Sequence, residues 1–123
     1  MNEYNILYEF DNGRKIQCKI IDGLEFRYNA MYRIWIDQDG VIYNELLQEL
    51  KPWLGTSNLN TKYYCLQLNG KRCYVHRLIA YCWCKGYQKG LVCDHVDGNR
   101  LNNHPSNLQW ITQSENIKKA FKK

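Results

Sequence analysis

The sequence lacks any long apolar segment. None of its hydrophobic runs approaches the ~20 residues that a membrane-spanning helix needs. The first ten residues, MNEYNILYEF, also lack the basic start and long apolar stretch of a secretory signal. We therefore expect a cytoplasmic protein with no membrane partner. The 123 residues, of which 45% are hydrophobic and 24% are charged, suit one globular domain with a modest core.

The sequence also lacks the C-x-x-C pair that zinc ribbons use. Its six cysteines are Cys18, Cys65, Cys73, Cys82, Cys84 and Cys93. We interpret them as reduced thiols, most of them small buried apolar residues. A zinc site that joins Cys82 or Cys84 to His76 stays open, and with it a zinc-stabilised interaction module.

Acidic residues are scarce in the second half of the chain. Residues 1–60 hold six Lys or Arg and nine Asp or Glu, a net charge of −3, whereas residues 61–123 hold eleven and three, a net charge of +8. The basic half is where a polyanion should bind, although an ordinary solvated surface can have this composition. Two of its three acids, Asp94 and Asp97, lie in the short stretch CDHVDG. A role in folding or in chemistry must account for them.

The residue pattern predicts an α+β fold whose N-terminal region is β-rich. Residues 5–20 form a hairpin candidate around Asp11-Asn12-Gly13, and residues 32–43 form a second one around DQDG. Residues 63–76 form the clearest hairpin, because the pair Asn69-Gly70 favours a type I′ turn. Between them, NELLQEL predicts a helical turn or two, and residues 53–62 read as a loop.

A helix is predicted after the third hairpin, over residues 75–87, with Gly86 as its stop. Two short strands, residues 90–95 and 107–112, should then flank a loop rich in Asp, Asn and Gly. The last segment, TQSENIKKAFKK, predicts a helix whose start is a capping box of Thr112 and Glu115.

The stretches YVHRLIAYCW and DHVDGNRLNNHPSNLQWITQSENIKKA closely resemble the HNH endonuclease family, and more narrowly the homing endonucleases encoded in phage introns. The resemblance covers roughly residues 74–121. It implies an HNH nuclease domain over residues 61–123, with the ββα-metal (His-Me finger) motif at about 90–123. Residues 1–60 would then recognise the DNA target or a protein partner, or form a dimer. The family setting implies a phage or another mobile element acting in a bacterial cytoplasm.

The resemblance assigns roles to four residues. His95 is the general base, and an ordinary His pKa of ~6.5 suits that role near neutral pH. Asn107 orients His95 by accepting a hydrogen bond from its ring. Asp94 and Asn116 hold one divalent metal ion, and their oxygen donors suit Mg²⁺ or Mn²⁺. Taken singly, each residue also has a structural reading, as a hydrogen-bonding His, a loop cap, a turn residue or an exposed helix residue.

The activity that the resemblance implies is metal-dependent hydrolysis of phosphodiester bonds in double-stranded DNA, by nicking or by cutting both strands. Candidates for phosphate contacts are Arg77, Arg100, Lys118, Lys119, Lys122 and Lys123. A DNA-binding protein of this fold without catalysis is the alternative. Related homing enzymes often continue into a helical DNA-reading module, whereas this sequence ends seven residues after Asn116. We expect either that this module is missing or that the chain is truncated. Target specificity is therefore expected from residues 1–60, or expected to be low.

Overall fold

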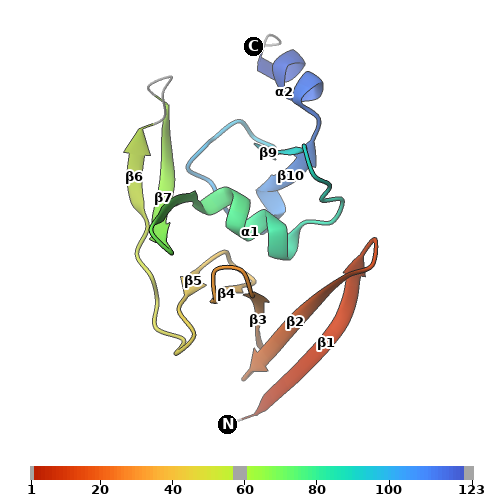
Figure 1. Cartoon of the computed structure of the whole chain (residues 1–123), viewed down its shortest axis with the longest axis vertical. Coiled ribbons are helices and arrows are strands. Elements are labelled where there is room, and N and C mark those ends of the chain that lie inside the picture. Colours follow the sequence, from red (N-terminus) through yellow and green to blue (C-terminus); the bar gives the residue numbers. More distant parts are fainter. Residues whose placement is uncertain (1, 57–60, 121–123) are drawn as a thin grey trace.

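The computed structural model describes residues 2–56 and 61–120. Within these residues the chain forms a five-stranded, a three-stranded and a two-stranded sheet, all antiparallel, together with two α-helices and one short 3₁₀ helix (Figure 1). This is the predicted α+β class. None of the described helices is long and apolar enough to cross a membrane.

The first sheet follows the chain in order: β1 (Glu3–Asp11), β2 (Arg14–Ile21), β3 (Leu24–Asn29), β4 (Ile34–Asp37) and β5 (Ile42–Tyr43). Both predicted N-terminal hairpins are confirmed, as β1–β2 and β4–β5. Strand β3 was not predicted. The sequence feature that indicates this strand is the turn pair Asp22-Gly23 before it. The φ values of this pair, 50° and 84°, are left-handed like those of the turn at Asn12-Gly13.

The short helix predicted for NELLQEL is wrong. The side chain of Asn44 accepts hydrogen bonds from the backbone N–H groups of Leu46 (2.9 Å) and Gln48 (3.0 Å), and Tyr43 forms an isolated antiparallel bridge with Glu49. An Asn side chain that satisfies nearby backbone donors competes with helix formation. Here that competition produces a tight turn.

The second sheet consists of β6 (Trp53–Thr56), β7 (Lys62–Leu68) and β8 (Lys71–Tyr74). The hairpin β7–β8 is confirmed, with φ of 52° at Asn69 and 76° at Gly70. The loop predicted for residues 53–62 is wrong at β6, which pairs with β7. Residues 57–60 of that prediction lie outside the described residues.

Helix α1 (Val75–Trp83) lies at the centre of the molecule (Figure 1). It ends three residues before the predicted stop at Gly86, because Cys84 is already extended (φ −111°, ψ 125°). Its buried face packs in one hydrophobic core with Ile34 and Ile36 of β4 and with Leu66 of β7. The main core therefore joins residues from both sides of position 60.

Two arginines of the first sheet hold the C-terminal end of α1. Nη1 of Arg14 donates to the carbonyl oxygen of Tyr81 (2.5 Å), and Nη1 of Arg27 donates to that of Cys82 (3.0 Å). The Arg27 guanidinium also lies 3.9 Å from the centroid of the Trp83 ring. The last turn of α1 has no basic residue of its own. These arginines supply the donors and the positive charge that a helix C-terminus needs.

The C-terminal elements are β9 (Val92–His95), the short 3₁₀ helix η1 (Pro105–Asn107), β10 (Leu108–Ile111) and α2 (Gln113–Ala120). The predicted capping box is confirmed. Thr112 Oγ1 accepts from the backbone N–H of Glu115, and Glu115 Oε1 accepts from the backbone N–H of Thr112, both at 3.1 Å. The Glu115 carboxylate accepts hydrogen bonds from the backbone N–H and from the hydroxyl of Thr112, and these two bonds hold the pKa of Glu115 below its usual value. Strands β9 and β10 pair, and α2 contacts β9.

Candidate active site

The end of β9 presents Asp94 and His95 on opposite faces of the two-stranded sheet, as neighbouring residues of a strand must. Asp94 pairs with Gln109 and faces α2, where it meets Lys119. His95 faces α1, and its ring centroid lies 4.9 Å from that of His76. Both residues are buried, with exposed fractions of 8% and 5%.

The carboxylate of Asp94 already accepts from a cation. Oδ2 of Asp94 accepts from Lys119 Nζ (2.7 Å) and from Gln109 Nε2 (2.9 Å). The same ammonium donates to the carbonyl oxygens of His95 (2.6 Å) and Val96 (3.1 Å). Lys119 was predicted to contact DNA phosphate. In the structure its ammonium lies among three oxygens of this site.

One ring nitrogen of His95 has a partner that fixes its chemistry. Nε2 of His95 lies 2.7 Å from Oδ1 of Asn103. An amide oxygen only accepts hydrogen bonds, so Nε2 carries the proton and the lone pair is on Nδ1. Among the described residues, Nδ1 has no hydrogen-bond partner. Its lone pair is therefore available to accept a proton.

Among the described residues, Asn107 does not form the predicted hydrogen bond with the His95 ring. Asn107 instead closes the loop between β9 and β10. Its Oδ1 accepts from the backbone N–H of Asp97 (3.0 Å), and its Nδ2 donates to Asp97 Oδ1 and to the Asn102 carbonyl oxygen, both at 2.9 Å. The Asn102 amide, the Asn99 backbone N–H and Asn107 hold the pKa of Asp97 below its usual value. The buried Asn107 side chain thus braces the loop that carries Asn103.

A cavity of about 190 Å³ connects the candidate residues. Its lining residues are Tyr63, Cys93, Asp94, His95, Gly98, Arg100, Asn116 and Lys119. Five predicted site residues from β9, the loop and α2 therefore meet in one place. Lys118 is exposed on α2 outside this lining, and Arg77 lines a second cavity. The predicted contacts Lys122 and Lys123 lie outside the described residues.

Aromatic rings form the wall of the site behind His95. The ring centroid of His76 lies 5.3 Å from that of Tyr63, in a stacked arrangement. Burial, followed by the nearby His95 and Arg77, lowers the pKa of His76 to about 3. His76 is therefore neutral near pH 7 and places no positive charge beside His95. Tyr63 and Asn103 are site residues that the sequence did not reveal.

The cysteines do not assemble a zinc site in the described part of the chain. All six are free thiols, and no group of three or more His, Cys, Asp or Glu side chains is arranged to hold a metal ion among the described residues. Burial raises the pKa of Cys82 to about 12 and that of Cys84 to about 11. Thiols with such pKa values stay protonated, whereas zinc binds thiolates.

Residues 73–118 match the family model described as HNH endonuclease. The resemblance to the HNH endonucleases is confirmed. The chain is 54% identical over 48 residues to the DNA endonuclease I-HmuI of Bacillus phage SP01, covering 39% of this chain and 28% of I-HmuI. It is 36% identical over 90 residues to YosQ, a SPbeta prophage-derived protein of Bacillus subtilis (strain 168) named as an HNH homing endonuclease, covering 72% of this chain and 52% of YosQ.

The likeness extends to a solved structure. The structure described as "DNA binding and cleavage by the HNH homing endonuclease I-HmuI" matches with a TM-score of 0.62 and 32% identity, over 78% of this chain and 57% of that chain. The likeness therefore reaches beyond residues 73–118. The chain spans about half or less of the length of these two curated relatives.

Proposed function

We propose that this chain is a metal-dependent DNA endonuclease whose active centre is the cavity at the end of β9. The observation that carries the proposal is the arrangement of His95, whose Nε2 is held by Asn103 while Nδ1 keeps a free lone pair. The buried carboxylate of Asp94 lines the same cavity. Double-stranded DNA as the substrate follows from the similarity to I-HmuI, whose structure is described as binding and cleaving DNA.

The residues present fit one divalent metal ion. Asp94 and Asn116 supply a carboxylate and an amide oxygen to one cavity, and such hard oxygen donors suit Mg²⁺ or Mn²⁺. The Lys119 ammonium, held by Asp94 and two backbone oxygens, is direct support for a cation at this position. When bound, the ion would neutralise charge on the phosphate and stabilise the departing oxygen.

The protein supplies the base. His95 Nδ1 takes a proton from the attacking water, and Asn103 keeps the ring in the required tautomer and orientation. Arg100, an exposed residue of the cavity lining, contacts a DNA phosphate. Hydrolysis then leaves a 5′-phosphate and a 3′-hydroxyl. Asn107 acts through the loop that it braces, rather than on the imidazole.

Residues 1–60 serve target recognition in this account. The hairpin β1–β2 lies at the lower right in Figure 1, away from β9 and α2, and exposes Tyr4, Ile6 and Leu7. A two-stranded ribbon can enter a DNA major groove. The net charge of −3 over residues 1–60 argues against a broad phosphate-binding surface there. Base contacts, rather than phosphate contacts, are therefore the expected contribution of this region.

Supercoiled plasmid tests the proposal. The protein is incubated with plasmid in Mg²⁺, in Mn²⁺ and in EDTA, with the variant Asp94→Asn as the control for contaminating nuclease. Metal-dependent conversion to open circles indicates nicking, and conversion to linear DNA indicates cleavage of both strands. Plasmid that stays supercoiled with either metal, while the protein binds it, would overturn the nuclease proposal in favour of a DNA-binding protein.

A further inference from the structure

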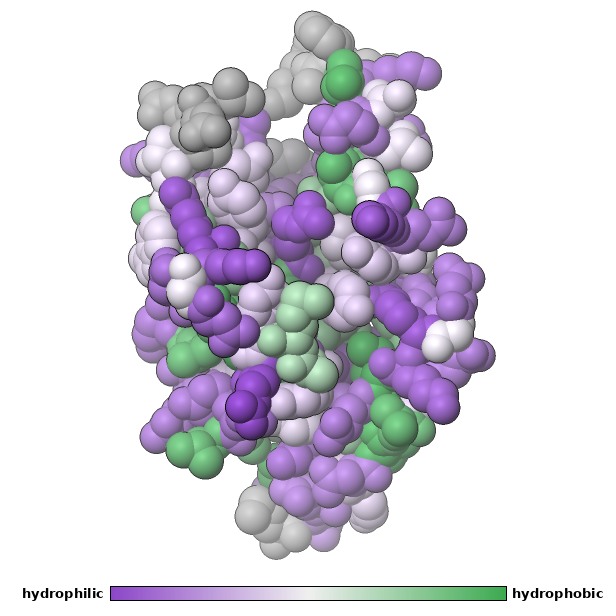
Figure 2. All heavy atoms as spheres, in the orientation of Figure 1, coloured by the Kyte–Doolittle hydropathy of each residue, from purple (hydrophilic) through white to green (hydrophobic). Residues whose placement is uncertain are grey.

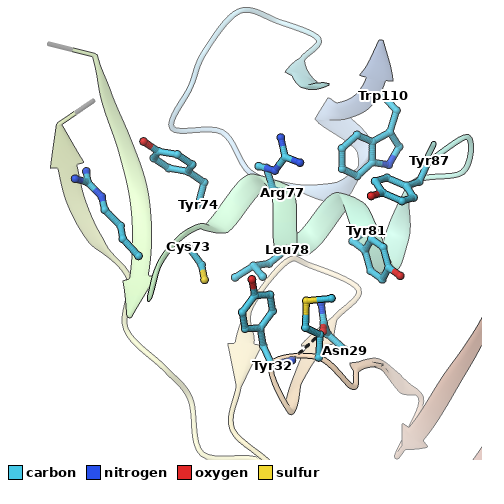
Figure 3. Close-up of a pocket in the computed structure, with 11 residues that line it drawn as sticks. Asn29, Tyr32, Cys73, Tyr74, Arg77, Leu78, Tyr81, Tyr87 and Trp110 are labelled. Carbon is cyan, nitrogen blue, oxygen red and sulfur yellow. Dashed lines mark hydrogen bonds between the residues drawn. The ribbon is translucent and has the colours of Figure 1, made fainter. Parts of the chain in front are cut away.

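A second cavity, of about 300 Å³, opens on the face of α1 shown in Figure 3. Five aromatic rings line it, from Tyr32, Tyr74, Tyr81, Tyr87 and Trp110, together with Arg72 and Arg77. None of the described residues in its lining is acidic. Figure 2 shows pale residues, neither strongly hydrophilic nor strongly hydrophobic, near the middle of the molecule in the view of Figure 1. The cavity is thus aromatic and cationic.

Three of the rings form a corner. The ring centroids of Tyr81 and Tyr87 are 5.1 Å apart at an interplanar angle of 72°, and those of Tyr87 and Trp110 are 4.9 Å apart at 70°. All three side chains are half-buried, so each ring keeps some surface towards the solvent. Edge-to-face packing fixes such rings without covering every face. The corner therefore offers ready surfaces for another flat ring.

Arg77 supplies a free cation beside this corner. Its side chain is exposed, and its guanidinium has no hydrogen-bond or ion-pair partner among the described residues. The guanidinium carbon lies 5.9 Å from the centroid of the Trp110 ring. Arg72 differs, because its Nη2 donates to the Thr56 carbonyl oxygen and its Nε to Cys65 Sγ. Arg77 is thus the arginine available to an anionic ligand.

The aromatic cavity adjoins the active site. Tyr74 lines the aromatic cavity and Tyr63 lines the cavity that contains His95, and their ring centroids are 5.3 Å apart. Both rings also contact the ring of His76. A pair of tyrosine rings therefore separates the two cavities.

We propose that the aromatic cavity binds one unstacked nucleotide of the DNA strand that is cut, next to the cleaved phosphodiester. The base packs against the rings of Tyr87 and Trp110, and Arg77 contacts its phosphate. The cavity lies at the small end of the roughly 300–1,000 Å³ range of ligand pockets, so it fits a single nucleotide rather than a base pair. Aromatic rings and arginine are the side chains that bind unpaired bases. The inference rests on the proposed nuclease function.

A mismatch scan tests this site. The nick is first mapped on plasmid, and short duplexes around it are made with a single mismatch moved along the uncut strand. Dissociation constants are measured by fluorescence anisotropy in EDTA, so that no cleavage occurs. A mismatch lowers the cost of unstacking the opposite base, so the protein should bind roughly tenfold more tightly when that base is the one that enters the cavity. The tightening should occur at one position adjacent to the nick.

Variants test whether the tighter binding of the mismatched duplex depends on the aromatic cavity. Tyr87→Leu should abolish the tighter binding, and Tyr87→Phe, the matched control, should keep it because the ring is retained. Thermal melting verifies that Tyr87→Leu is folded. If the plasmid is cut but no position shows tightening, or a folded Tyr87→Leu variant retains it, this inference is wrong and the nuclease proposal stands. If the plasmid is not cut, the nuclease proposal fails and the nucleotide site fails with it.

Discussion

The ammonium of Lys119 lies 2.7 Å from Oδ2 of Asp94, so the carboxylate proposed to bind a metal ion is already paired with an internal cation. The side chain of Asp94 is only 9% exposed, whereas that of Lys119 is 38% exposed. A buried carboxylate needs a counter-charge. A divalent ion at Asp94 must therefore compete with a cation that belongs to the same chain.

Replacing Lys119 should strengthen metal binding. In Lys119→Met the competing ammonium is gone, and a charge-assisted hydrogen bond contributes roughly 1.5–3 kcal/mol. Mn²⁺ should consequently bind about tenfold more tightly or better, as measured by electron paramagnetic resonance of free Mn²⁺ in titrations without DNA. Lys118→Met, on the exposed side of the same helix, is the matched control and should bind Mn²⁺ like the original protein. Equal affinities in all three proteins would show that Lys119 does not compete.

Asn103 should act as a positioning residue for His95. Loss of its Oδ1 in Asn103→Ala frees the imidazole to rotate and to change tautomer. Changes to such supporting hydrogen bonds typically cost roughly 10–100-fold in activity, so kcat should fall by this amount while Mn²⁺ affinity is unchanged.

Asn103→Asp separates this role from a purely structural one. The carboxylate still accepts from Nε2, so activity should largely return. Its negative charge also favours the protonated imidazole. The part of the pH–rate profile in which the rate increases with pH should therefore move to higher pH. An alanine variant with full kcat, or an aspartate variant with an unshifted profile, would contradict the assigned contact.

The local features of the fold could be predicted from the sequence because each depends on a few neighbouring residues. The turn at Asn69-Gly70 and the capping box of Thr112 and Glu115 are of this kind. Strand β6 was missed because its pairing with β7 is not encoded within its own residues. The turn after Tyr43 was misread because a helical pattern does not reveal that the Asn44 side chain satisfies the backbone.

The candidate active site, like the fold, could be predicted only in part from the sequence. Asp94 and His95 could be placed because they end a recognisable strand. Which asparagine meets the imidazole depends on how the whole loop closes, and the structure selects Asn103 rather than Asn107. The sequence likewise shows Lys119 as one of several basic residues on α2. That its ammonium turns towards Asp94 follows from tertiary packing.

Arg27, whose side chain is only 12% exposed, should contribute more to stability than an exposed arginine does. It donates to the Cys82 carbonyl oxygen at the end of α1 and pairs with Glu25. Removing both in Arg27→Met should lower the free energy of unfolding by about 2–3 kcal/mol, measured by urea denaturation. Arg33→Met removes a pair with Glu45 in which the arginine side chain is 71% exposed. That loss should be within about 1 kcal/mol. Equal losses in the two variants would argue against the helix-end role.

Acid should weaken the fold through His76. Its pKa is about 3 in the folded protein against 6.5 for the ordinary group, because burial disfavours the charged ring. Above pH 6.5 both states are neutral and the full stability is present. As the pH falls from 6.5 towards 3, the unfolded chain binds a proton that the folded chain does not, which costs about 1.4 kcal/mol per pH unit.

Urea denaturation between pH 6.5 and pH 5 measures this effect. The original protein should lose about 2 kcal/mol more than His76→Phe over that interval, because phenylalanine fills the same aromatic site without titrating. The two remaining histidines, His95 and His104, are common to both proteins. Parallel losses of stability would show that His76 titrates normally in the folded state.

The most direct test of the central claim compares His95→Ala with His104→Ala in the plasmid assay with Mg²⁺. Both variants lose one imidazole, but His104 is exposed, and its ring contacts Ser106 at the start of η1 and Asp39 rather than a residue that lines the cavity. The account predicts that His104→Ala cleaves like the original protein. His95→Ala, with its fold verified by thermal melting, should be slower by roughly 10²–10⁴-fold, the usual contribution of a general base. A folded His95→Ala variant that cleaves as fast as the original protein would contradict the account.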